Sequence, residues 1–320
     1  MIDAYVIEPH WANWLLVLEM FVAGVAAGTY FVAALANIAG GGGGIAEDRE
    51  VAARLGFVPL PLMLVTAALL ITDLGEPGRF LNLIFLSPFA EERGPGPLML
   101  NVNSPMNWGT YAITLFGIFT FFAFMDALSH SGRLPRALRM GWGEALSHNP
   151  VWLGLGAFFA LATGTYSGVL LNVTNQNVWG DTVLLGAMYM TFSALSGMAV
   201  AAIVADRQKA TRTAGAVRSG LIAFAAISGV LLLLFVANLA AVGRATPLVA
   251  TLGALVGPVF WIGAVGAAIL FPIVILTRRP GLVVAGIAAG RLAVIGVVVL
   301  IGVLAFRYAL LYSALAAVEG

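Results

Sequence analysis

The sequence predicts an all-α integral membrane protein with eight transmembrane helices, arranged as two four-helix bundles. The chain has 320 residues, of which 61% are hydrophobic and 10% are charged. An ordinary globular domain carries about 25% charged residues. Mean hydropathy is +0.98, and the apolar residues gather in runs longer than the roughly 18 that indicate a membrane-spanning helix.

The apolar runs follow one another along the whole chain, and each reaches the about 20 residues that cross the hydrocarbon core. The first run is too long for the hydrophobic region of a signal peptide, so we expect it to be retained as a helix. Residues 1–320 are therefore expected to form a single integral membrane domain. The runs cover residues 13–38, 52–72, 107–129, 150–172, 182–205, 217–241, 248–276 and 285–313.

Arginine and lysine gather on one side of this topology, which sets the expected orientation. Connections that face the cytoplasm carry an excess of these residues. We therefore expect both termini and the connection 73–106 on the outer side of a bacterial or archaeal cytoplasmic membrane. The basic connections and adjoining helix ends hold Arg49, Arg54, Arg133, Arg136, Arg139, Arg207, Lys209, Arg212, Arg218, Arg278 and Arg279, against Arg79, Arg93 and Arg244 on the other side.

The first segment carries a carboxyl group, Glu19, inside an otherwise apolar run. It stands about six residues into the helix, roughly 9 Å below the outer surface at 1.5 Å per residue. Ionisable groups inside a membrane are costly and mark functional sites. Glu19 is a candidate proton carrier. The alternative is a glutamate hydrogen-bonded to a neighbouring helix as structural glue.

The second segment contains Pro59 and Pro61, which membrane helices tolerate, and ends at Asp73 on the outer side. The stretch DLGEPGR that follows has Glu76 and Arg79, and Arg79 could pair with Asp73 or Glu76. This stretch is expected either to rim a pocket or to cap the helix, since acid, glycine and proline commonly end helices. The 73–106 connection is long enough to dock a partner.

The fourth segment carries Tyr166, also roughly 9 Å below the outer surface if the helix runs outward from Pro150. Gly164 and Gly168 form a GxxxG pair, which permits close helix packing. A tyrosine hydroxyl at this depth needs a hydrogen-bond partner. Tyr166 is either a pocket residue or core filler. Together with Glu19 and Asp73 it places polar groups from three helices in one slice of the membrane.

In the last segment Arg307 lies in the outer part of the helix, where it could pair with an acid or extend to the interface. Asp126, Asp206 and His130 lie at inner helix ends, where solvation explains them. Other chemistry is missing from the sequence. The chain has no cysteine, and its histidines lie at or beyond helix ends. We therefore expect no intrinsic haem and no iron–sulfur cluster in this chain.

Five stretches, taken in order, resemble the NrfD/polysulfide reductase family of membrane subunits. The resemblance covers about residues 12–313, and the order and spacing of the stretches are specific. The stretches are FVAGVAAGTYFVAAL at 21–35, DLGEPGRFLNLI at 73–84, SPMNWGTYAI at 104–113, TYSGVLL at 165–171 with Trp179 and SALSGMA after it, and FRYALLY at 306–312.

This resemblance implies a quinone-reactive anchor subunit with eight helices in a respiratory electron-transport complex. Its expected partners are a ferredoxin-like iron–sulfur subunit and a molybdopterin catalytic subunit. The family's pocket for menaquinone or ubiquinone lies on the outer side. Tyr166 matches the pocket tyrosine and Asp73 the helix-end aspartate. Glu19 falls where some members carry a histidine. Arg79, Glu76 and Arg307 are expected to support the pocket and its proton relay.

Two other interpretations remain open at the level of the sequence. A secondary transporter could use Glu19 for proton coupling, although transporters usually place ionic sites near the midplane, in repeated halves. An inert structural anchor would need no buried glutamate. Substitution of Glu19, Tyr166 and Asp73 separates these functions.

Overall fold

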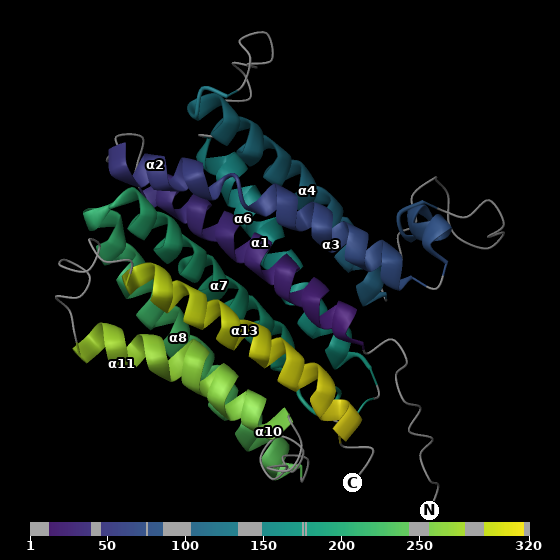
Figure 1. Cartoon of the computed structure of the whole chain (residues 1–320). Coiled ribbons are helices and arrows are strands. Elements are labelled where there is room, and N and C mark those ends of the chain that lie inside the picture. Colours follow the sequence, from purple (N-terminus) through teal and green to yellow (C-terminus); the bar gives the residue numbers. More distant parts are fainter. Residues whose placement is uncertain are drawn as a thin grey trace, which may run out of the picture.

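The computed structural model is all-α, and eight of its helical stretches are long and apolar enough to cross a membrane (Figure 1). The prediction of eight spans is confirmed. Within the described residues the structure has no β-sheet. The described residues are 13–39, 46–74, 76–85, 104–133, 149–174, 176, 178–242, 256–278 and 291–316.

The helices begin and end close to the apolar runs in the sequence. The clearest difference is α8, which starts at Thr211 rather than at 217, since polar residues continue the helix before the apolar run. In chain order the elements are α1 (Trp14–Ala39), α2 (Ala46–Leu55), α3 (Pro59–Asp73), η1 (Pro77–Leu83), α4 (Pro105–His130), α6 (Pro150–Asn172), α7 (Leu185–Gln208), α8 (Thr211–Ala241), α10 (Val256–Pro258), η3 (Val259–Leu270), α11 (Phe271–Arg278) and α13 (Arg291–Ala316).

Two spans are composite, and proline explains both breaks. The second span joins α2 to α3 through a turn, and Pro59 starts α3 at the first helical position, where its missing N–H costs nothing. The seventh span contains η3, a π-helix. The π-helical hydrogen bonding ends at Phe271, directly before Pro272. There the N–H of Phe271 donates to the carbonyl of Gly266, five residues earlier. Proline cannot make the next helical hydrogen bond, so the ladder changes there.

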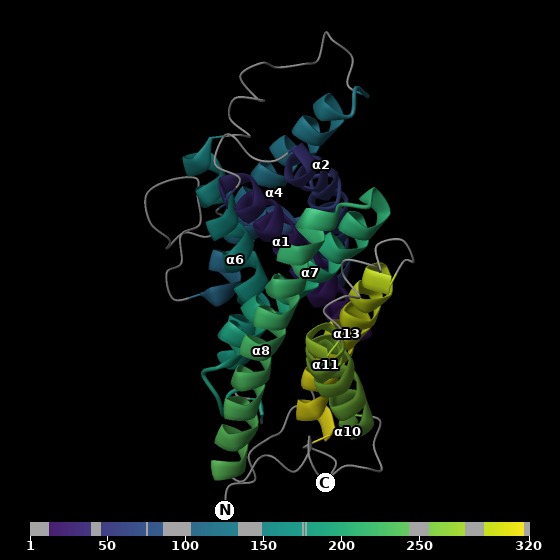
Figure 2. The same ribbon diagram turned by 90° about the vertical axis from the view of Figure 1, so that its left-hand side faces the viewer.

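Helices α1 and α7 form the centre of the molecule. Helices α3 and α6 pack against α1, and α8 and α13 pack against α7, while α4 contacts α3 and α6 (Figures 1 and 2). A side chain at Gly28 would meet the carbonyl of Ser193, and one at Gly197 would meet the carbonyl of Gly28. The two central helices therefore touch backbone to backbone, as small residues allow in membranes. The grouping into two bundles and the sides of the termini stay predictions.

We name the two ends of the helix array by one residue each. The Glu19 end contains the start of α1, the end of α3 and the start of α4. The His130 end contains the end of α1, α2, the end of α4 and the start of α6, and it lies at the upper left in Figure 1.

Part of the predicted docking connection 73–106 is described. The short 3₁₀ helix η1 follows α3, and its end is held against α4 by two hydrogen bonds. The Asn107 side chain donates to the carbonyl of Leu83 at 2.9 Å, and the Tyr111 hydroxyl donates to that of Ile84 at 3.0 Å. The remainder of this predicted docking connection, residues 86–103, lies outside the described residues.

Candidate functional site: a buried acid beside an apolar groove

Glu19 lies in the interior of the protein, one and a half turns into α1. Its side chain is 3% exposed, and its Oε1 atom has no hydrogen-bond partner among the described residues. The start of α1 is fixed by Asn13, whose side-chain oxygen accepts from the N–H groups of Leu15 at 2.8 Å and Leu16 at 3.2 Å. This helix cap holds the turn that carries Glu19.

Asp73 is joined to the same cap rather than to the residues that follow it. The Asn13 amide donates to Oδ1 of Asp73 at 2.8 Å, which ties the end of α3 to the start of α1. Glu76 and Arg79 are exposed. Among the described residues no ion pair connects Arg79 with Asp73 or Glu76. Thus Asp73 lies next to the first helix, and Arg79 and Glu76 remain at the surface.

Arg307 is almost completely buried, with 1% of its surface exposed. Its Nη2 atom donates to the carbonyl of Tyr189 at 3.2 Å and to the Ser193 hydroxyl at 3.1 Å. Its guanidinium carbon lies 3.7 Å from the centre of the Tyr189 ring. This is close enough for a cation–π interaction, which stabilises a desolvated cation. The guanidinium thus sits against α7, within the membrane span.

Buried Glu19 and buried Arg307 lie within electrostatic reach of one another without making an ion pair. No distance of 4.0 Å or less joins Glu19 to Arg307, yet the two groups interact electrostatically. The Nε and Nη1 atoms of Arg307, like Oε1 of Glu19, lack hydrogen-bond partners in the described chain. Gly24 makes the room for this arrangement, because an added Cβ would lie 3.0 Å from Nη2 of Arg307.

Tyr166 lies on α6, and its ring rests on Gly109 of α4, where an added Cβ would collide with the ring. Within the described residues its hydroxyl makes no hydrogen bond with the protein. It is close enough to Glu19 for an electrostatic interaction. The structure therefore brings Tyr166, Glu19 and Arg307 into one region, with Asp73 near Glu19 as well.

A groove of about 680 Å³ opens beside Tyr166 between α4 and α6. Its lining is almost entirely apolar, and several of its residues are exposed on the outer surface of the helices, including Trp108 at 55% and Phe158 at 63%. In a membrane such a groove faces lipid. It is lined by Pro105, Trp108, Gly109, Tyr111, Ala112, Leu115, Phe158, Phe159, Leu161, Ala162, Thr165, Tyr166, Val169 and Met190.

Sequence reasoning missed Tyr189 and Ser193, which hold Arg307. The Tyr189 hydroxyl, fully buried, donates to the sulfur of Met20 at 3.4 Å. Tyr189 and Ser193 are four residues apart and therefore lie on one face of α7. This spacing was the signal in the sequence from which a shared polar contact could have been predicted. The described residues contain no cluster of three or more histidine and acidic side chains that could hold a metal.

The profile of a protein family described as "Polysulphide reductase, NrfD" matches residues 7–319, essentially the whole chain. The chain belongs to the NrfD family. Members of this family are membrane subunits of oxidoreductase complexes and typically associate with iron–sulfur and molybdopterin subunits. This match over residues 7–319 confirms the resemblance seen in the sequence motifs. A search of curated proteins found no match.

Proposed function

We propose that this NrfD-family chain is the quinone-reactive membrane anchor of a respiratory oxidoreductase. It would exchange electrons between menaquinone or ubiquinone and a docked ferredoxin-like iron–sulfur subunit, itself connected to a molybdopterin catalytic subunit. The observation that carries this proposal is the Tyr166 hydroxyl, which has no hydrogen-bond partner among the described residues. Tyr166 lines an apolar groove beside buried Glu19.

The groove suits a quinone in size and polarity. Ligand pockets of this kind hold about 300–1,000 Å³ and combine apolar walls with a few polar groups. A quinone headgroup has two acceptor oxygens on an apolar ring, and its tail belongs in lipid. Tyr166 can donate a hydrogen bond to one of these oxygens. The exposed apolar rim leaves the tail in the membrane.

Quinol oxidation supplies two electrons and two protons, so the protein must accept protons at the site. In our proposal Glu19 takes up a proton, and Arg307 stabilises the carboxylate before it does so, because the two charges attract in a low-dielectric interior. Asp73 lies near Glu19 and half-exposed at the helix end, where it can pass protons to the surface. Arg79 and Glu76 sit at the outer rim, beyond Asp73.

The proposed orientation places the Glu19 end outward, in the cytoplasmic membrane of a bacterium or archaeon, with both termini outside. It rests on the arginine and lysine residues at the opposite end, such as Arg54, Arg133 and Arg207. The helix packing supports two groups of four spans, one around α1 and one around α7. The connection 73–106 at the outer end is the proposed docking site for the iron–sulfur subunit.

Affinity purification of the tagged chain from its native membrane tests the proposal. We expect an iron–sulfur subunit to co-purify and the complex to oxidise or reduce quinone. Glu19→Gln should lower turnover by about a hundredfold, because it removes a proton acceptor without changing the shape of the side chain. Tyr166→Phe should weaken quinone binding, whereas Tyr312→Phe, on α13 outside the groove, should not.

The contrary result is equally clear. A chain that purifies alone and binds no quinone would exclude the anchor function and favour a proton-coupled transporter. In that case Glu19→Gln should abolish uptake of a solute instead.

A further inference from the structure

The connection between α6 and α7 enters the interior of the protein at Trp179, although connecting segments usually run over the surface. Trp179 is the largest fully buried side chain among the described residues. Its indole Nε1–H donates to the backbone carbonyl of Leu310 on α13 at 2.8 Å. A buried tryptophan needs a partner for this single donor. The hydrogen bond therefore joins the segment directly before α7 to the last membrane helix.

Val178, directly before Trp179, has a backbone conformation that β-branched residues avoid. Its φ angle is 73°, in the left-handed region where a branched side chain clashes with the backbone. The Val178 N–H donates to Oδ2 of Asp181 at 2.9 Å, which holds this conformation. Strained backbone persists only where its surroundings hold it, and such residues gather at functional sites. The strain here accompanies the insertion of Trp179 into the interior.

Three contacts in succession fasten α13 to the part of the chain that forms α7. The Phe306 ring stacks on Phe192, with ring centroids 3.9 Å apart and an interplanar angle of 3°. The guanidinium of Arg307 lies over the ring of Tyr189 and bonds to its carbonyl. Leu310, three residues after Arg307, accepts from the indole. Residues three and four apart share one face of a helix, so all three contacts lie on the same side of α13.

The contact with Trp179 sets the register of α13, which apolar packing alone does weakly, because lipid is as apolar as the helix surface. A slip of α13 by one residue would turn Arg307 by about 100° around the helix axis and move it by about 1.5 Å. Among the described residues no ion pair holds Arg307 to Glu19. Their interaction depends on distance in a low-dielectric interior. The position of Arg307 relative to Glu19 therefore depends on the register of α13.

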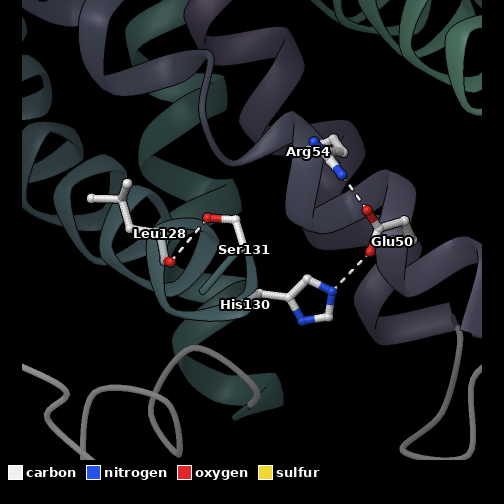
Figure 3. Close-up of polar contacts among 5 residues, drawn as sticks. All are labelled: Glu50, Arg54, Leu128, His130 and Ser131. Carbon is white, nitrogen blue, oxygen red and sulfur yellow. Dashed lines mark hydrogen bonds and ion pairs between the residues drawn. The ribbon is translucent and has the colours of Figure 1, made fainter. Parts of the chain in front are cut away.

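The polar contacts at the His130 end are of a different kind (Figure 3). Nε2 of His130 lies 2.9 Å from Oε2 of Glu50, and Nε of Arg54 donates to Oε1 of the same carboxylate at 2.8 Å. All three side chains are partly exposed, and exposed pairs contribute little to stability. Water can replace these contacts, whereas it does not reach the hydrogen bond of the fully buried Trp179. The surface cluster is therefore a suitable control.

We propose that Trp179 is a positioning residue, which fixes the register of α13 and so keeps Arg307 within electrostatic reach of Glu19 during proton uptake. The inference rests on the proposed quinone function, in which Glu19 accepts a proton and Arg307 stabilises its carboxylate. Trp179 does not line the apolar groove. It acts through Arg307, so its loss should change the rate of proton uptake rather than the binding of quinone.

Trp179→Phe keeps an aromatic ring and removes the N–H donor. In the whole complex we expect kcat for quinol oxidation to fall about tenfold while KM stays within about twofold, because Tyr166 and most of the groove belong to α4 and α6. Trp261→Phe is the matched control, since this side chain on η3 is 42% exposed. Neither Trp261→Phe nor Glu50→Gln should change kcat or KM.

Infrared difference spectra between the oxidised and reduced complex report on Glu19 itself. The band of this carboxyl is assigned by its absence from the spectra of Glu19→Gln. In Trp179→Phe the band should shift, because the positive charge of Arg307 has moved relative to the carboxyl. A merely structural role of Trp179 would lower the amount of folded complex, but it would leave both the band and the kcat of each folded complex unchanged.

Asp181→Ala tests the same arrangement through the backbone, since it removes the acceptor of the Val178 N–H. We expect kcat to fall about threefold and the Glu19 band to shift in the same direction as in Trp179→Phe. If Trp179→Phe does not assemble into the complex, Asp181→Ala decides the question by the same two measurements.

The outcomes separate the two proposals. A wild-type complex without quinone activity would overturn the proposed function. A complex that turns over quinone would overturn the positioning role alone if Trp179→Phe kept a normal kcat and an unshifted Glu19 band, or if only KM changed.

Discussion

Tyr166 and Tyr30 rest on glycines of neighbouring helices at opposite ends of the protein, and they differ in what their hydroxyl groups face. Tyr166 packs on Gly109 beside a large apolar groove that opens toward lipid. Tyr30 packs on Gly156 beside a small cavity with charged walls. In both places the glycine makes room for the ring. The linings differ, since one is almost entirely apolar and the other carries charged and polar side chains.

The charged groups near the two tyrosines differ in the same way. Glu50, Arg54 and His130 pair with one another at the surface, where such pairs are worth little. Glu19 and Arg307 are buried and do not pair directly. Their burial is costly, so their presence calls for a function that needs them. The four variants that follow test this contrast, from the largest expected effect to the smallest.

Removal of the buried cation should have the largest effect. Arg307→Met is expected to lower the free energy of unfolding by about 3–5 kcal/mol, because it leaves a buried acid without its nearby positive charge. Arg54→Met, at the surface, should cost less than about 1 kcal/mol. Loss of folded protein on heating in detergent measures both. Equal losses would contradict the contrast between the two ends.

Displacement of Tyr166 should weaken ligand binding as well as helix packing. In Gly109→Ala the new methyl group collides with the Tyr166 ring, and overpacking of this kind costs about 1–3 kcal/mol. We expect quinone to bind about tenfold more weakly, as measured by titration of the complex. Gly117→Ala on the same helix meets open space and is the control. A Gly109→Ala complex with normal affinity would separate Tyr166 from the quinone site.

Displacement of Tyr30 is the matched change at the other end. Gly156→Ala pushes the hydroxyl out of its place, whereas Gly154→Ala on the same helix meets nothing within 4 Å. Gly156→Ala should lower the free energy of unfolding by about 1–3 kcal/mol, because the Tyr30 ring has to shift, whereas Gly154→Ala should leave it unchanged. Quinone affinity should not change. If affinity fell instead, the two ends would not be independent.

The smallest effect is expected at the surface cluster. Glu50→Gln should lower the free energy of unfolding by less than about 1 kcal/mol. The difference from wild type should disappear in 1 M salt, where the Debye length is about 3 Å. Heating at low and high salt measures it, with Glu19→Gln for comparison. Salt should not alter the effect of Glu19→Gln, because that carboxyl is 3% exposed and mobile ions screen a buried charge much less.

Hydropathy alone was sufficient for the number of spans, because a helix in lipid must satisfy its own backbone and therefore needs a long apolar run. The GxxxG pair also pointed to a real close contact, since Gly168 lies against the backbone of Leu185 and Gly164 against Ser193. Depth counting placed Glu19 and Tyr166 at a similar level, and the structure brings them together.

The rest depends on how helices are rotated and paired, which one-dimensional spacing does not contain. The sequence suggested Arg79 as an ion-pair partner of Asp73. In the structure Asp73 instead accepts a hydrogen bond from Asn13, directly before α1. It left the surroundings of Arg307 open, and these turned out to be Tyr189 and Ser193 of α7. Neither cavity was visible in the sequence, because each is built from residues of at least three separate helices.

The most direct test of the central claim is photolabelling of the purified complex with a light-activated quinone analogue, followed by mapping of the modified peptides. Our account predicts that the label lies on α4 and α6 at the groove, near Trp108, Phe158 and Tyr166, and that excess natural quinone prevents it. Labelling confined to other helices, or labelling that natural quinone does not reduce, would contradict the account.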